Sequence, residues 1–406
     1  AAWDIGCIIR WLDFNDTWLA EEWGHPSDNL GAILAVSDHL SQQQLAKGEA
    51  SITMRTVLKS MVMAHEIQGC LALKNAFNRV GLDHVILVKV ASTAVVAKLL
   101  GASREQILSA LSHAWVDGQS LRTYRHAPNT GSRKSWAAGD ATSRAVRLVD
   151  IAMRGEMGVP SALTAPQWGF YDVLFSKNNK DQSIKTVDQR KFSFQRDYHC
   201  YVMENILFKI SFPAEFHAQT ACEAAITLHP KIKQKVDKIE RIEITTHESA
   251  IRIISKEGEL TNAADRDHCL QYMVAIPLLF GKLTAEHYED SFHQQHPEID
   301  KLRQKMHVIE DKVYSADYHD PDKRSIANAI QVFFTDGSAT DKIVIEYPIG
   351  HRRRRNQGIP LLKEKFKNNL MSQFSSSTTE QIYDLCNQQE QFDVMAVSDF
   401  MSLFKC

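Results

Sequence analysis

Cysteine is scarce in this sequence, and its spacing matches no familiar pattern. The 406 residues include seven cysteines, an odd number, and none belongs to a Cys-x-x-Cys pair. A disulfide framework or a structural zinc site is therefore not expected, and the reducing cytoplasm fits this composition best. The spacings also offer no cluster of thiolates for an iron–sulfur site.

A strong charge of one sign and long apolar runs are missing as well. The formal net charge is −2, so no overall basic excess exists to hold a nucleic acid. The apolar stretch at 84–100 contains lysines and the one at 273–280 is short, so neither is expected to span a membrane. One basic run, 351–355, is more typical of a solvated or interface-lining turn than of nucleic-acid binding.

Signature motifs of cofactor and metal enzymes are not found either. There is no Walker A phosphate loop, no glycine-rich dinucleotide motif, no HExxH zinc motif and no GxSxG nucleophile motif. No secretion signal opens the chain, which begins within an amphipathic helix carrying Trp3, Cys7, Ile8 and Trp11 on one side. We expect further residues upstream, no metal, no cofactor, and a chemistry that runs on protein side chains.

Hydrophobic periodicity predicts helices over the first two hundred residues. Apolar residues recur every three or four positions over 54–67 and 82–100. Ser103 and Gln106 form a capping-box pattern before the next amphipathic segment. A further helix is predicted over 135–154, after which glycines and prolines mark a break.

The region after about residue 209 has a different character. Ile242 and Ile244 alternate with polar residues, as in a half-buried strand. Residues 333–335 and 342–347 flank an Asp-Gly pair, which is typical of a hairpin. A helix is predicted between them, over 267–280.

The tail turns helical again from about residue 360. We therefore predict a mainly α fold with an inserted α+β domain. A helical domain would form from both chain ends, residues 1–208 and 349–406. A smaller α+β lid domain would comprise residues 209–348, leaving a cleft between the two domains, a common place for a small-molecule site.

Two histidines stand beside short polar residues. His25 is followed by a proline and preceded by Asp13 and Thr17, and could transfer a proton near neutral pH. His84 follows Asp83 at a predicted helix start. Helix capping by the short polar residues is the alternative for both; the spacing alone favours it around His25 and does not decide between the two interpretations for His84.

Basic residues gather just before the helix predicted at 135–154. They are Arg122, Arg125, His126, Arg133 and Lys134. A helix N-terminus favours anions, so a bound polyanion would explain why cations are tolerated there. A solvated basic loop is the alternative.

Two further groups lie in the predicted lid. Lys209 and His217 flank an apolar segment, where a lysine is costly unless it is paired or functional. Tyr272 follows His268 by four residues on the predicted helix, so the two side chains would share a face. A surface lysine and a packed core aromatic are the alternatives, and the pattern alone favours them.

Longer strings that contain these residues resemble the MmgE/PrpD family. The strings are residues 11–18, 23–29, 77–84, 120–130, 134–141, 208–217 and 265–268. The resemblance extends over essentially the whole chain. It implies a helical domain built from both chain ends, an inserted α+β lid, and a homodimer.

The resemblance also implies a site. The cleft residues of the family correspond to Asp13, Thr17, His25, His84, Lys134, Lys209, His217 and Tyr272. The implied reaction removes water from a tricarboxylate, 2-methylcitrate, to give 2-methyl-cis-aconitate in propionate breakdown.

Each residue then has an expected role. Lys134, Lys209 and either Arg122 or Arg125 would bind the carboxylates. His25 and His84 would share the base and acid roles, in an order left open. Tyr272 and Asp13 would orient the substrate or donate to it, and Thr17 and His217 would contact it.

Other activities remain open at this point. A cis-aconitate decarboxylase would use the same pocket, a dicarboxylate epimerase is a more distant possibility, and a non-catalytic scaffold could keep the pocket without turnover. The segment between Thr17 and His25 is longer than in the decarboxylase branch, which favours the dehydratase.

Overall fold

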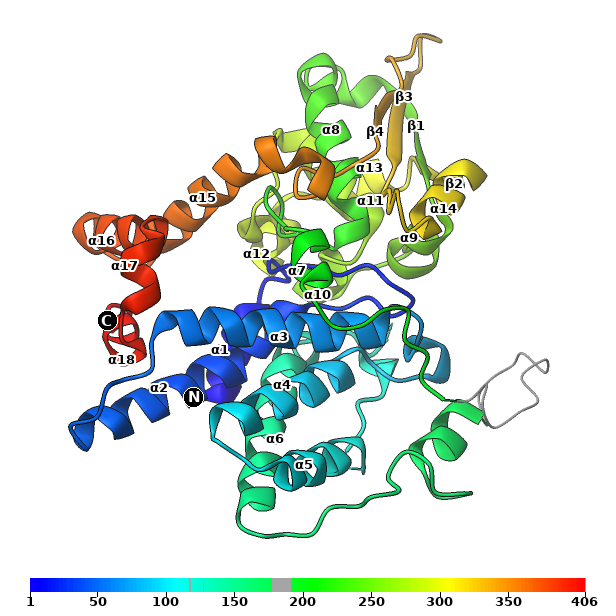
Figure 1. The fold of residues 1–406 in the computed structure, drawn as a ribbon. Helices are drawn as coiled ribbons and strands as arrows, with labels where there is room; N and C mark the ends of the chain where they lie inside the picture. Colours follow the sequence, from blue (N-terminus) through cyan, green and yellow to red (C-terminus); the bar gives the residue numbers. More distant parts are fainter. Residues whose placement is uncertain (117, 127, 177–190, 406) are drawn as a thin grey trace.

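Helices predominate in the computed structural model, which describes residues 1–116, 118–126, 128–176 and 191–405. Helices from the first part of the chain form a bundle, drawn in blue to cyan in Figure 1. They are α1 (Ala2–Arg10), α2 (Leu30–Ala46), α3 (Met54–Ala72), α4 (Val85–Leu99), α5 (Arg104–Val116) and α6 (Arg133–Met153).

The helix predictions for this part are confirmed. The segments predicted at 54–67, 82–100 and 135–154 correspond to α3, α4 and α6. The capping box before α5 is also present: the Ser103 amide donates to Gln106 Oε1 at 2.8 Å, and the Gln106 amide donates to Ser103 Oγ at 3.2 Å. α4 is apolar almost all round and is buried along nearly its whole length, so it forms the centre of the bundle.

A short helix, α7 (Tyr201–Asn205), precedes a small mixed sheet of order β2-β1-β3-β4. The strands are β1 (Ile239–Thr246), β2 (Met306–Glu310), β3 (Asn328–Phe334) and β4 (Ile343–Ile345). β1 runs parallel to β2, with Ile244 beside Val308, and antiparallel to β3. The predicted hairpin is confirmed as β3 and β4, which pair antiparallel.

Helices cover this sheet and supply its core. They are α8 (Gln219–Ile232), α9 (Glu248–Ile254), α10 (Ala263–Arg266), α11 (Leu270–Phe280), α12 (Asp290–Gln295), α13 (Glu298–Arg303) and α14 (Lys312–His319). The buried isoleucines of β1 pack with α8 and α11 in one hydrophobic cluster. The helix predicted at 267–280 begins later than expected, because residues 267–269 lie between α10 and α11. The chain is mainly α with a small α/β part, as predicted.

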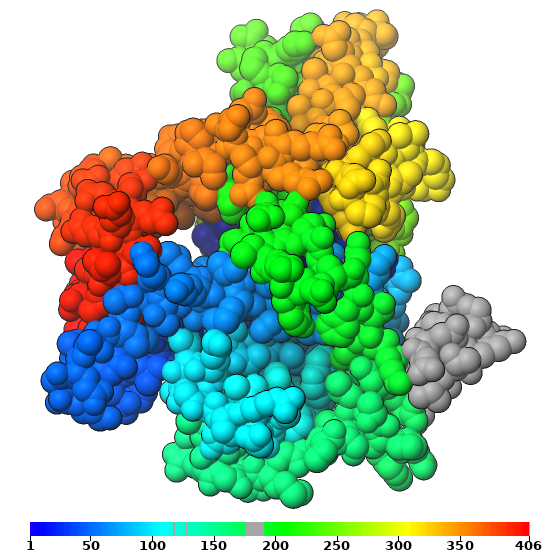
Figure 2. All heavy atoms as spheres, in the orientation of Figure 1, coloured from blue at the N-terminus to red at the C-terminus, as the bar shows by residue number. Residues whose placement is uncertain are grey.

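The C-terminal helices return from the sheet unit to the bundle. They are α15 (Arg355–Met371), α16 (Ser376–Asn387), α17 (Gln389–Val394) and α18 (Val397–Ser402). Figure 2 shows them as the orange and red edge that joins the upper part of the molecule to the blue helices. Val397 packs in one buried cluster with Ile33 of α2 and with Met54 and Val57 of α3.

Two expectations concern the chemistry of the chain as a whole. Cys7, Cys70, Cys200, Cys222, Cys269 and Cys386 are all free thiols, and Cys406 lies outside the described residues. Over the ranges that the structure describes, no helix combines the length and apolarity needed to cross a membrane.

The first helix turns a different side inward from the one its apolar residues indicate. Ile8 is 75% exposed and Trp11 is 59% exposed, whereas Gly6 faces the bundle. A Cβ at Gly6 would lie 2.8 Å from the Cα of Gly139 in α6. Close contact between the helix backbones at Gly6 and Gly139 therefore helps to fix α1 against α6, together with the contact between the rings of Trp3 and Trp136.

This close contact predicts that a glycine-to-alanine substitution in the helix lowers the free energy of unfolding instead of raising it. Alanine normally stabilises a helix interior relative to glycine by about 1 kcal/mol. At Gly139, the new Cβ would collide with the backbone of Trp3 and the sulfur of Cys7. We expect Gly139→Ala to lower the free energy of unfolding by about 1–3 kcal/mol, measured by urea denaturation with circular dichroism. Gly131→Ala, with open space around its Cβ, is the control. Equal stability of the two variants would contradict the packing argument.

Candidate active site

A cleft of about 570 Å³ lies where loops of the helical bundle face the sheet unit. Most residues predicted for the site line it: Asp13, Thr17, His25, His84, Arg122, Arg125 and His217. Glu215, Ile253 and His268, from beyond residue 209, complete the opposite wall. The cleft therefore collects ionisable side chains from segments far apart in the sequence.

His25 has one ring nitrogen on the backbone and the other near Asp13. Nδ1 lies 2.5 Å from the carbonyl oxygen of Asp16. Because a carbonyl can only accept, Nδ1 must carry the proton and Nε2 is the free base. Nε2 lies 3.9 Å from Oδ1 of Asp13. Burial and the positive charge of Arg10 lower the pKa of His25 well below its ordinary value, so the ring is neutral.

His84 stands against His25 with both of its own ring nitrogens unused. The two rings meet edge to face, with centroids 5.2 Å apart. Within the described part of the chain, neither buried nitrogen of His84 has a hydrogen-bond partner, and Nδ1 is 3.4 Å from Oδ1 of Asp83. Burial lowers the pKa of His84 well below its ordinary value. Buried polar atoms without partners are uncommon, and here they lie in a cleft that a ligand could occupy.

Asp13 occupies the centre of a buried charge cluster. Its carboxylate pairs with Arg10 and accepts a hydrogen bond from Lys209 Nζ at 2.8 Å. Lys209 Nζ also donates to the Asp13 carbonyl. Burial alone would raise the pKa of Asp13, but the charges of Arg10 and Lys209 outweigh it and hold that pKa well below its ordinary value. Asp13 has φ of +49°, a strained backbone conformation of the kind that collects at functional sites.

The two predicted arginines share one carboxylate. Arg125 donates from Nε and Nη2 to Asp83, with the Nη2–Oδ1 distance at 3.0 Å. Arg122 Nη1 is 3.6 Å from the same carboxylate and has no hydrogen-bond partner among the residues described. The Arg122 guanidinium also lies over the ring of Trp23, 5.3 Å from its centroid. Arg122 is therefore the arginine with donors to spare.

Lys134 stands directly behind the cleft wall. Its ammonium donates to both oxygens of Asp267 at 2.7 Å and lies 2.9 Å from Nδ1 of His268, which lines the cleft. Burial lowers the pKa of Lys134 from its ordinary value, opposed by the charge of Asp267. Lys134 and Lys209 thus reach the site through aspartates. The alternative of a surface lysine at position 209 is wrong, because both lysine side chains are buried.

His217 is held from both sides. Its Nδ1 is 2.7 Å from Glu215 and its Nε2 is 2.9 Å from the hydroxyl of Tyr318. Burial would raise the pKa of Glu215, but His217 outweighs it and brings that pKa to about 2. The Glu215 carboxylate therefore accepts a hydrogen bond from Nδ1, and the Tyr318 hydroxyl fixes the other side of the ring.

The structure does not bring Tyr272 to the cleft. Its side chain is fully buried in the core of the sheet unit, and its hydroxyl donates to the carbonyl of His287 at 2.7 Å. The spacing argument is wrong because His268 lies between α10 and α11, off the helix that carries Tyr272. The alternative of a packed core aromatic describes this residue.

Three residues in or beside the cleft were not predicted from the sequence. Arg10 and Glu215 line the cleft, and Lys365 of α15 donates from Nζ to the carbonyls of Phe14 and Lys209, each at 2.7 Å. The spacing of Arg10 before Asp13 and of Glu215 before His217 was the available signal for the first two. No local signal marks Lys365, because its contacts are made with chain segments more than 150 residues away.

Several buried polar atoms in the cleft lack a protein partner. They are Arg10 Nε, Thr17 Oγ1, Arg122 Nη1 and both ring nitrogens of His84, judged over the described ranges. The described residues contain no group of three or more His, Cys, Asp or Glu side chains arranged to hold a metal ion. The arrangement can therefore bind an anion through arginines and exchange protons through two neutral histidines.

Comparison with known proteins gives the family. The MmgE/PrpD N-terminal domain matches residues 1–183 and the MmgE/PrpD C-terminal domain matches residues 212–390. The chain is 61% identical over its whole length to the 2-methylcitrate dehydratase of Escherichia coli (strain K12), covering 82% of that protein. It is 58% identical to the 2-methylcitrate dehydratase of Cupriavidus necator, covering 81%.

A more distant organism gives the same result. The mitochondrial 2-methylcitrate dehydratase of Yarrowia lipolytica is 58% identical over 95% of this chain and 73% of its own length. The two domain matches together span most of the chain, and these relatives are all more than 50% identical to it. On this evidence the chain belongs to the MmgE/PrpD family.

Proposed function

We propose that the cleft removes water from 2-methylcitrate and forms 2-methyl-cis-aconitate, a hydro-lyase step of propionate catabolism. The names of the full-length relatives support this substrate. The structural observation that carries the proposal is the set of buried polar atoms on Thr17, His84 and Arg122 that have no hydrogen-bond partner among the described residues and surround one cleft. A tricarboxylate with a hydroxyl group supplies partners for all of them.

The cleft suits a trianion because its cations are already ordered. Arg122 and Arg125 line it directly, and Arg10 does so from the end of α1. Guanidinium groups donate to carboxylates in pairs, which fixes the orientation of the substrate. Lys134 and Lys209 add positive charge behind the wall through Asp267 and Asp13. The carboxylate-binding roles proposed for the arginines agree with those expected from the sequence. The two lysines differ from that expectation, because they act through the aspartates with which they pair.

The two histidines divide the proton transfers. His25 Nε2 is unprotonated because Nδ1 is bonded to Asp16, so we assign it as the base that removes the proton next to a carboxylate. A bound trianion favours a protonated His84, which can then give its proton to the departing hydroxyl. The C–H electron pair forms the new double bond, the C–O bond breaks, and water leaves. Thr17 would hold the hydroxyl or a carboxylate.

We also propose that residues 209–348 act as a lid over a helical domain made of 1–208 and 349–406, and that two copies of the chain associate. The cleft has walls from both sides of residue 209, so closure of such a lid would exclude bulk water from the reaction.

The proposed reaction has a direct test. We expect 2-methylcitrate to give a conjugated product, detected by ultraviolet absorbance, with undiminished rate after exhaustive chelation, because the acid and base are side chains. Release of carbon dioxide from cis-aconitate would instead indicate the decarboxylase. Thermal stabilisation by the tricarboxylate without turnover would indicate a scaffold. Activity that is lost on chelation and returns with iron would contradict the side-chain mechanism.

Removal of Lys134 tests the charge behind the wall. We expect Lys134→Met to lower kcat by about 10²–10³, the effect of removing one electrostatic stabiliser. Lys98→Met, at an exposed position of α4, is the control and should leave kcat unchanged. Because Lys134→Met removes the lysine that pairs with Asp267 and leaves that carboxylate with its contact to His268 Nδ1 at 2.8 Å, the double variant with Asp267→Asn checks whether folding suffers from the lost ion pair. Unchanged turnover in a folded Lys134→Met variant would remove Lys134 from the site.

Protonation of the histidines can be measured without turnover. The lowered pKa values predict that His25 and His84 are both neutral in the free protein at pH 6.5, the ordinary histidine pKa. Both histidines are neutral in the folded protein but would take up a proton near pH 6.5 in the unfolded chain. The free energy of unfolding should therefore fall as the pH drops below 6.5. Binding of tricarballylate, which has no hydroxyl to eliminate, should protonate His84. Nitrogen-15 shifts of labelled histidine, assigned with His25→Asn and His84→Asn, report both states. A half-protonated ring at pH 6.5 without ligand would contradict the assignment.

A further inference from the structure

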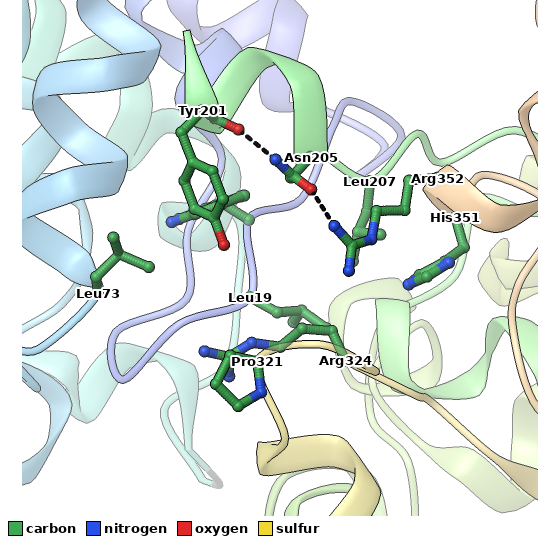
Figure 3. Close-up of a pocket in the computed structure, with 10 residues that line it drawn as sticks. Leu19, Leu73, Tyr201, Asn205, Leu207, Pro321, Arg324, His351 and Arg352 are labelled. Atoms are coloured by element: carbon green, nitrogen blue, oxygen red, sulfur yellow. Dashed lines mark hydrogen bonds between the residues drawn. The ribbon is translucent and has the colours of Figure 1, made fainter. Parts of the chain in front are cut away.

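A second pocket lies beside the cleft, at the meeting point of three parts of the chain. It spans about 370 Å³, open solvent included, between the loop after α1, the helix α7, and the turns at Arg324 and Arg352. Figure 3 shows side chains from all of these segments converging on it. The basic run at 351–355, which the proposed reaction does not use, supplies one side of this pocket.

The polar side of the pocket is cationic. Arg352 is fixed by donation from Nη1 to Asn205 Oδ1 at 2.6 Å and from Nη2 to the Asp322 carbonyl at 2.8 Å. The Arg324 guanidinium has no hydrogen-bonded or ion-paired partner in the part of the chain that the structure describes, and Arg324 has φ of +46°. None of the described side chains lining the pocket is a carboxylate. His351 adds no charge near neutral pH, because burial and the adjacent Arg352 lower its pKa to about 4.

The remaining walls are apolar, with one hydroxyl. Leu19, Leu73, Leu207 and Pro321 line the cavity. In Figure 3 the hydroxyl of Tyr201 points between Leu73 and Leu19, toward the side on which Arg324 lies. A half-buried guanidinium beside apolar side chains suits a ligand with one anionic group and a short hydrocarbon part.

We propose that this pocket is an effector site for a short aliphatic carboxylate. The carboxylate bonds to Arg324 and Arg352, and the hydrocarbon part packs on Leu19 and Leu73. Such a ligand fits because phosphate or sulfate would leave the apolar wall unfilled, and a neutral molecule would leave Arg324 unpaired.

The pocket is coupled to the cleft by shared structure. Leu19 lines both cavities. Leu207, also in the pocket, pairs with Thr17 of the cleft through two backbone hydrogen bonds of 2.9 and 3.0 Å. A ligand that orders Leu19 and Leu207 therefore acts on Thr17. The proposed effect of the carboxylate on turnover rests on the proposed dehydration, whereas its binding to this pocket does not.

The probe is butyrate, with butyramide as the neutral analogue, followed by saturation-transfer NMR and by thermal shift. We expect butyrate to bind and butyramide to bind at least tenfold more weakly. Arg324→Gln should weaken butyrate binding by about tenfold or more, the effect of losing a charge-assisted hydrogen bond. Tyr201→Phe should weaken it less. Arg353→Gln is the matched control, because Arg353 belongs to the same basic run and lies over Tyr347 outside the pocket.

Two comparisons distinguish this site from the cleft. Lys134→Met should keep butyrate binding, and in the turnover assay butyrate should change kcat for 2-methylcitrate without raising KM. Binding that survives Arg324→Gln in the folded protein, or that is lost in folded Lys134→Met, would overturn the proposed site. Butyrate bound at Arg324 with kcat unchanged would leave a binding site and overturn its effector role.

Discussion

Three aspartates at the edge of the cleft, Asp13, Asp83 and Asp267, each accept hydrogen bonds from a buried lysine or arginine. Lys209 and Lys134 are almost completely buried, so each would be very costly without its carboxylate. Each pair also joins segments that are distant in the sequence. The Lys134–Asp267 pair ties α6 to the loop before α11, and the Lys209–Asp13 pair ties the loop after α1 to the entry of the sheet unit. The need to neutralise buried charge therefore determines how the two parts of the molecule meet.

This constraint also shapes the chemistry of the cleft. Most cations of the cleft are paired with these aspartates. His25 and His84 are neutral, because burial lowers the pKa of each. A bound trianion would change that balance, because it adds about as much negative charge as the three aspartates together already supply. Binding and proton uptake are then one event, which provides the acid only when the substrate is present. Arg125 directs two donors at Asp83, whereas Arg122 Nη1 has no hydrogen-bond partner within the part of the chain that the structure describes, which leaves it available to a ligand.

The sequence predicted those features that depend on local pattern. The three-to-four-residue periodicity located α3 and α4, the Ser103–Gln106 pair located the start of α5, and the Asp336-Gly337 turn located the hairpin. The family resemblance placed distant residues such as His25 and His84 in one site, although no local pattern connects them.

The direction in which a side chain points was less predictable. Tyr272 turns into a core, Trp11 turns to solvent, and Lys365 reaches two carbonyls across the molecule. Tertiary packing rather than local spacing decides each of these cases, so neither periodicity nor a short motif could reveal them.

The most direct measurement is a crystal structure with tricarballylate bound. We predict its carboxylates against Arg122 and Arg125, with a ring nitrogen of His84 and the hydroxyl of Thr17 hydrogen-bonded to the ligand. A tricarballylate bound elsewhere, or a filled cleft in which His84 still has no partner, would contradict the claim that these buried groups are held ready for a tricarboxylate.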